Sequence, residues 1–135
     1  MATLVVTGPG MSEVRISAAE WRVMEVVWGR KAATAAEVIA ALAGSSRWGS
    51  RTVRTLLARL VAKGALAAAA DGNRYVYRPR VTRDRCVREE SRSFVRRVFA
   101  GDTAELLVHF LREADLPPER VDELRRLLDE KRPQR

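Results

Sequence analysis

The chain has 135 residues, of which 47% are hydrophobic and 31% charged, and this suits one folded domain, or a small domain with an appended element. One cysteine excludes an internal disulfide and a multi-thiolate metal site, and no apolar run approaches the roughly 18 residues of a membrane span. With no convincing signal peptide either, we expect a reducing, cytoplasmic location.

The positive charge is concentrated in one part of the chain. Residues 38–83 contain nine of the 25 basic residues and, of the 17 acidic ones, only Asp71, so this stretch carries the whole formal net charge of +8. Excess positive charge confined to one segment is typical of a surface that binds a polyanion. A charged face that serves only solubility would be spread more evenly.

The first elements in chain order are an arm and two helices. Residues 1–15 include a Gly-Pro-Gly sequence and lack helical periodicity, which predicts a flexible N-terminal arm. The capping box Ser17–Glu20 opens a helix that ends near Gly29. A second capping box, Thr34–Glu37, opens a short helix that stops by Gly44.

Residues 50–63 predict a third helix with two unlike faces. Its apolar residues recur at i, i+3, i+4, i+7 and i+8, namely Val53, Leu56, Leu57, Leu60 and Val61. The other face carries cations and hydroxyls and no carboxylate: Arg51, Thr52, Arg54, Thr55, Arg59 and Lys63. A helix that enters the major groove of DNA needs such donors, because carboxylates there would be repelled by phosphates.

After the third helix the apolar residues no longer recur with the period of a helix, and the pattern indicates a β-hairpin. Residues 65–70 are small and apolar, residues 75–78 are rich in β-formers, and Asp71-Gly72-Asn73-Arg74 between them is turn chemistry. The alanine-rich first strand has a weak β propensity, so a helical extension is the main alternative.

Three short helices followed by a hairpin predict a winged helix-turn-helix domain over residues 16–80. The fold class is therefore mainly α with a small β-hairpin wing. The candidate DNA-binding residues are the polar face of the third helix, Arg47 and Trp48 in the turn before it, and Arg74 at the tip of the wing. We expect Trp21 and Trp28, seven residues apart on one helical face, to pack in the core.

Residues 81–135 predict a second domain of three amphipathic helices. About 55 residues bury only a thin core alone, so we expect pairing with the same segment of a second chain, as a homodimer. The alternative is a monomer in which these helices fold back onto the first domain. The expected dimer contacts are Phe94, Val98, Leu107, Phe110, Leu111, Leu124, Leu127 and Leu128.

Several separated motifs occur in a familiar order. They are ISAAEWRVM followed by VW, then RTVRTLLARL with KG, the hairpin end YVYRP, and LPPERVDELRRLL near the C-terminus. Over roughly residues 14–131 the chain resembles the BlaI/MecI/CopY family of penicillinase-type repressors. The resemblance implies a homodimeric winged-helix repressor of antibiotic-resistance genes that binds dyad-symmetric operator DNA through the third helix.

Two positions depart from the family pattern. The copper-responsive members carry paired Cys-x-Cys motifs near the C-terminus, and this tail has no cysteine, so no metal site is expected. The β-lactam-responsive members are cleaved at an Asn–Phe bond in the dimerisation domain, and the matching place here is His109-Phe110. The resemblance implies a membrane-bound sensor protease as a partner, with this bond as the candidate cleavage site.

Other readings of the function remain open. The alternative release signals are a small ligand, a pH change at His109 and oxidation of Cys86. The neighbouring Arg85 and Arg88 would lower the pKa of Cys86. A protein-interaction adaptor is a less favoured alternative. No glycine-rich phosphate loop, nucleophile elbow or metal-ligand spacing is present, so we expect no enzyme activity and no cofactor.

Overall fold

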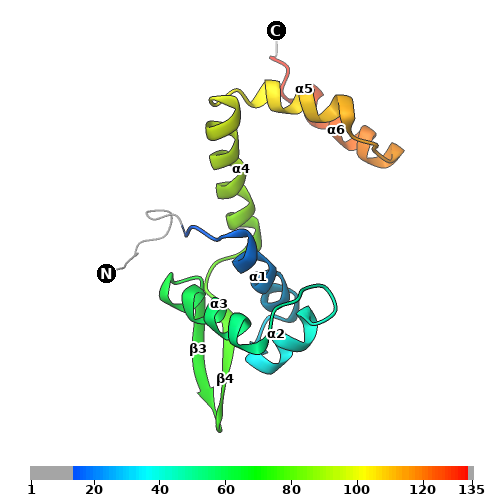
Figure 1. Ribbon diagram of the computed structural model, residues 1–135. Helices are drawn as coiled ribbons and strands as arrows, with labels where there is room; N and C mark the ends of the chain where they lie inside the picture. The colour runs from blue at the N-terminus through cyan, green and yellow to red at the C-terminus, as the bar shows by residue number, and fades with distance from the viewer. Residues whose placement is uncertain (1–13, 134–135) are drawn as a thin grey trace. The chain divides into compact units, whose positions relative to one another are not determined.

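The computed structural model describes residues 14–133, in which six helices and three strands are found (Figure 1). The predicted fold class, mainly α with a small sheet, is confirmed. Residues 1–13 of the predicted arm lie outside the described residues. The elements are α1 (Ala18–Arg30), β2 (Ala33–Thr34), α2 (Ala35–Leu42), α3 (Ser50–Ala62), β3 (Leu66–Asp71), β4 (Arg74–Pro79), α4 (Arg83–Phe99), α5 (Thr103–Glu113) and α6 (Pro118–Glu130).

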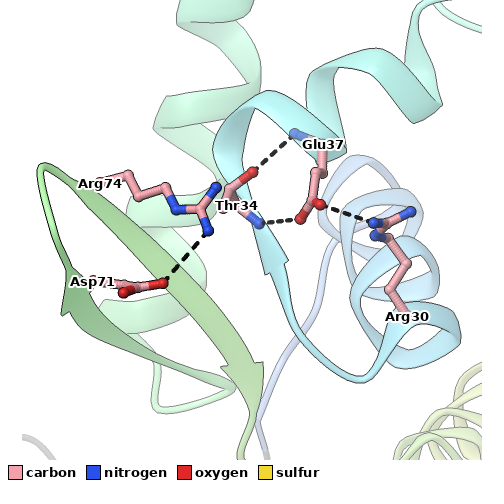
Figure 2. A network of polar contacts seen from close by, with 5 residues as sticks. All are labelled: Arg30, Thr34, Glu37, Asp71 and Arg74. Atoms are coloured by element: carbon pink, nitrogen blue, oxygen red, sulfur yellow. Dashed lines mark hydrogen bonds and ion pairs between the residues drawn. The ribbon is translucent and has the colours of Figure 1, made fainter.

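Both predicted capping boxes are present at the starts of α1 and α2. The Glu20 N–H donates to Ser17 Oγ at 3.1 Å, and the Ser17 N–H donates to Glu20 Oε1 at 2.9 Å. Thr34 and Glu37 make the same reciprocal pair at 3.2 and 2.8 Å (Figure 2). Each box satisfies two N–H groups that a helix start leaves without partners, which fixes where these helices begin.

The strands form an antiparallel sheet in the order β2-β4-β3. The hairpin pairs every residue of β3 with one of β4, from Leu66 opposite Pro79 to Asp71 opposite Arg74, with Gly72 at a positive φ in the turn. The alternative helical extension is therefore wrong. The two-residue strand β2 was not predicted, because so short a segment carries no alternation.

The hydrophobic core lies where α1, α2 and α3 meet the sheet (Figure 1). Its largest fully buried side chains come from all three helices and from the start of β3: Met24, Leu57, Leu60, Leu66, Val23, Val27, Val38 and Val53. Trp21 and Trp28 are half-buried and pack edge to face with ring centroids 5.6 Å apart. Core packing was predicted for both, and of the two it is Trp28 that packs against the core. The buried side of α3 thus packs against the core of its own domain.

The chain forms two compact units that divide within α4, the first ending at Ser91 and the second beginning at Arg92. The prediction placed the domain boundary eleven residues earlier, after residue 80. The first turns of α4 go with the first unit, and Arg83 in these turns pairs with Glu25 of α1. None of the described helices is both long and apolar enough to span a bilayer.

Candidate nucleic-acid interface

Helix α3 keeps its polar side chains together on one side. Val53, Leu56, Leu57 and Leu60 are buried, and five of the predicted DNA-binding side chains are exposed: Arg51, Thr52, Arg54, Thr55 and Arg59. At about 100° per residue these five positions fall within one arc of about 160°, opposite the buried ones. We call this side of the helix the basic face.

Six exposed arginines of the basic stretch, residues 38–83, have no acidic partner within residues 14–133, and three of them lie on the basic face. They are Arg47, Arg51, Arg54, Arg59, Arg78 and Arg80. Other arginines of the chain are paired, for example Arg30 with Glu37 at 2.9 Å and Arg85 with Glu89 at 3.1 Å. Guanidinium groups without a carboxylate are available to the oxygens of a phosphate, which they bind in a bidentate fashion.

The N-terminal end of α3 has no side-chain cap. Its N-cap is Gly49, and its first turn contains no acidic residue, whereas α1 and α2 each have a glutamate there. The positive end of the helix dipole and the first N–H groups therefore favour a phosphate. The missing cap can be read from the sequence, since Thr52 stands where a capping box has glutamate, but it was not among the predicted features.

Arg22 holds the turn between α2 and α3, a role that was not predicted. Its Nη2 donates to the Ser45 carbonyl at 2.8 Å and to Ser45 Oγ at 2.9 Å, and its guanidinium carbon lies 4.9 Å from the centre of the Trp48 ring. These partners are more than twenty residues away in sequence, so no local pattern reveals them.

Trp48 lies half-buried beneath Arg22 and packs against the core. The indole N–H groups of Trp21 and Trp28 are bonded, to Glu25 at 3.1 Å and to the Val81 carbonyl at 2.9 Å. The backbone N–H of Trp48 donates to Ser46 Oγ at 3.4 Å, but its indole N–H has no hydrogen-bond partner among residues 14–133. It is the one of the three tryptophans that has a donor left for a phosphate.

Lys63, unlike the arginines of the basic face, is already paired within the domain, which the sequence did not predict. Its Nζ donates to Glu20 Oε1 at 2.5 Å and to the Arg15 carbonyl at 2.6 Å. The Glu20 residue is only 2% exposed. Burial raises the pKa of Glu20, but the hydrogen bonds from Lys63 and Ser17 and the charge of Lys63 outweigh burial, and the pKa is lowered. Lys63 therefore ties the end of α3 to the start of α1.

The tip of the wing carries Arg74, whose Nη2 lies 3.5 Å from Asp71 Oδ2 (Figure 2). Both side chains are well exposed, and an ion pair of this kind contributes about 0–1 kcal/mol. A phosphate can therefore replace Asp71 at little cost. Tyr75, the next residue, is 58% exposed and was not predicted, although its hydroxyl is a suitable phosphate donor.

The second unit leaves a large apolar surface exposed. Neither α5 nor α6 contains a buried residue. Phe94 and Leu124, two of the predicted dimer contacts, are half-buried, and the rings of Phe94 and Phe110 are 6.3 Å apart. The other predicted contacts are exposed: Val98, Leu107, Phe110, Leu111, Leu127 and Leu128.

His109 and Phe110, the candidate cleavage site, are both exposed and lie inside α5. The ring of His109 is 6.4 Å from that of Phe99 and 6.0 Å from that of Phe110. The peptide bond between the two residues is therefore part of a helix and not of an extended segment.

Cys86 is buried, and burial together with the nearby charge of Glu89 raises its pKa to about 11. The lowered pKa expected from Arg85 and Arg88 is wrong, because desolvation of the thiolate outweighs the attraction of Arg85, and Arg88 pairs with Asp84 instead. The thiol is not a reactive one, which removes the physical basis for a redox switch at this position.

Comparison with known proteins places the chain in a family. Residues 16–130 match the family model described as Penicillinase repressor. The chain is 34% identical over 116 residues to the penicillinase repressor of Bacillus licheniformis, covering 86% of this chain and 91% of that protein. It is 32% identical to the methicillin resistance regulatory protein MecI of Staphylococcus aureus (strain N315), covering 86% of this chain and 94% of MecI.

Among solved structures, the DNA-binding domain of the repressor BlaI superposes with a TM-score of 0.49 and 38% identity, over 54% of this chain and 90% of that domain. The curated relatives are named as repressors and as a resistance regulator, and not as enzymes. With a family model matched over most of its length and a relative above 30% identity that it covers almost completely, the chain belongs to the penicillinase repressor family of DNA-binding repressors.

Proposed function

We propose that this chain is a homodimeric transcriptional repressor that occupies a dyad-symmetric operator through the basic face of α3 and the β3–β4 wing of each copy. The observation that carries the proposal is the set of exposed arginines on α3 that have no carboxylate partner within residues 14–133, on a helix whose other side is buried. Such a helix is suited to the major groove, with its N-terminal residues at base edges. Arg51 and Arg54 would bind guanine or phosphate, and Thr52 and Thr55 would face bases.

The dimer is supported by the second unit. Neither of these two helices buries a residue within one chain, and exposed apolar side chains grouped on them are typical of a protein interface. A second copy of the same segment offers a matching apolar face, which is how two-fold symmetric interfaces form. Two DNA-binding units held together would then meet two half-sites related by a dyad.

Release of the operator by weakening of this dimer is part of the proposal. Cleavage between His109 and Phe110 by a membrane-bound sensor protease stays a prediction. Because this bond lies within α5, cleavage requires local unwinding of the helix. Incubation with such a protease, followed by mass measurement of the fragments, distinguishes proteolytic release from release by a small ligand.

Binding-site selection from random duplex DNA tests the function. We expect enrichment of two inverted copies of one half-site, with centres about 10 base pairs or a multiple of that apart. The matched control is the double variant R51A/R54A, which should enrich no sequence. Failure of the natural chain to enrich any site, or to bind random duplex DNA at all, would overturn the proposal and favour the adaptor alternative.

A further inference from the structure

The segment that joins the wing to α4 is held against α1 by a pair of directional contacts. Arg83 donates from Nε to Glu25 Oε1 at 2.9 Å and from Nη2 to Glu25 Oε2 at 3.1 Å, a two-point contact. Trp21 Nε1 also donates to Glu25 Oε2, at 3.1 Å. The indole of Trp28 donates to the Val81 carbonyl at 2.9 Å. Helix α1 thus binds the chain on both sides of residue 82.

Apolar packing also contributes here, since Val81 packs against the core and Cys86, in the first turns of α4, is buried. An open surface pocket of about 550 Å³ lies between α1 and the segment, lined by Gly29, Pro79, Arg80 and Thr82 as well as by the contact residues themselves. Apolar packing is non-directional, whereas hydrogen bonds fix the angle between the groups that they join. Arg83 is also the first residue of α4, which continues as one helix to Phe99. The contacts therefore set the direction of the first turns of α4 relative to α1.

The other ion pairs at the start of α4 cannot have this effect. Arg85 with Glu89, and Arg88 with Asp84, join residues four apart on the same helix. They stabilise α4 locally and do not reach α1. Among the ion pairs of the described residues, Glu25 with Arg83 is the one that joins α1 to α4.

We propose that Glu25, Trp28 and Arg83 are positioning residues that set which spacing of operator half-sites the dimer accepts, an inference that rests on the proposed function. Moving a half-site by one base pair shifts it by about 3.4 Å and rotates it by about 35°. If the first turns of α4 keep a fixed direction relative to α1, the dimer tolerates such a shift of one half-site poorly. A dimer with a loosened connection tolerates it better and discriminates less between spacings.

The experiment measures affinity for synthetic duplexes that carry two inverted copies of the selected half-site at spacings changed by one or two base pairs. In R83Q and E25Q, the ratio of affinities between the best and the shifted duplexes should fall by about two- to fivefold, the range expected for one exposed ion pair. W28F, which removes the donor to Val81 and keeps a ring, should act in the same direction. Affinity for a single half-site should not change in these variants.

The matched control is R88Q, which makes the same charge change on the same helix without touching α1. It should keep the spacing preference of the natural chain. The double variant E25Q/R83Q should lose no more discrimination than R83Q alone, since both residues act through one contact.

Two results would overturn the inference while leaving the proposed function intact. One is an unchanged spacing preference in R83Q, E25Q and W28F. The other is an equal loss of affinity for every duplex, the single half-site included, which indicates a merely structural role. If the natural chain binds paired half-sites no better than a single one, the proposed function itself fails and takes this inference with it.

Discussion

Arg51 and Arg54 lie one turn apart on the exposed side of α3, and each lacks a carboxylate partner within the described part of the chain. By contrast, Arg30 forms an ion pair with Glu37, and Arg120 forms one with Glu123. An arginine that is already paired must give up a partner before it binds a phosphate. Arg51 and Arg54 have no carboxylate partner to give up among the described residues, and we therefore assign them to the DNA interface.

The first prediction concerns Arg54. Arg54→Ala should weaken binding to the selected operator by about 1–3 kcal/mol, because a bidentate contact is lost at each half-site. Fluorescence anisotropy with a labelled duplex measures the change. Arg112→Ala, which removes an exposed arginine from the second unit, is the control and should bind normally. Equal affinities of the Arg54 variant and the natural chain would remove Arg54 from the interface.

The second prediction concerns Lys63 and pH. Lys63→Met leaves the buried carboxylate of Glu20 without its cation, so the free energy of unfolding at pH 7 should fall by about 1–3 kcal/mol. The pKa of Glu20 is lower in the folded state than in the unfolded one. Its stabilising contribution is therefore present above the unfolded pKa, near 4.5, and lost as the pH falls through the folded pKa.

Urea denaturation of both proteins between pH 3 and pH 7 measures this effect. The difference in unfolding free energy should be largest at pH 7 and should shrink as Glu20 becomes protonated. A difference that stays constant over this pH range would show that Lys63 stabilises the domain without Glu20.

The third prediction concerns the thiol of Cys86. With a pKa of about 11, the thiolate at neutral pH is roughly two orders of magnitude scarcer than that of a free cysteine with a pKa near 8.5. A disulfide exchange reagent should therefore label the native protein far more slowly than the urea-unfolded protein. Equal labelling rates in the two states would contradict the buried position of this side chain.

At the scale of elements, helix ends and helix faces could be predicted from sequence, and contacts between distant residues could not. The capping boxes and the apolar stripe of α3 are local patterns, and each is found where it was expected. The pairing of Lys63 with Glu20 was not predicted because the two residues are 43 apart in sequence. The same holds for Arg22 with Ser45 and for the burial of Cys86, which depend on tertiary packing.

The fourth prediction concerns α6. Leu128→Asp places an unpaired carboxylate on the proposed dimer face, so the dimer dissociation constant should rise about a hundredfold or more. Arg126→Asp is the matched control, since residue 126 lies about 200° around the helix from residue 128. Sedimentation equilibrium should show monomers for the Leu128 variant and dimers for the control. A dimeric Leu128 variant would place the interface elsewhere.

At the scale of the whole molecule, the chain separates charge from apolar surface. The stretch that carries the formal excess of +8 falls within the first unit, and the exposed apolar side chains of α5 and α6 belong to the second. One unit is thus suited to a polyanion and the other to a second copy of itself. The charge segregation was readable from sequence, whereas the division of α4 between the two units was not.

The central claim is that the arginines of the basic face bind DNA phosphates, and the salt dependence of operator binding tests it most directly. Affinity of the natural chain should fall steeply between 50 and 200 mM salt, with a log–log slope of about −0.9 for each phosphate neutralised. In R51A/R54A the slope should be shallower by about 2 to 4, since a dimer loses up to four such contacts. An unchanged slope and affinity in this variant would contradict the account.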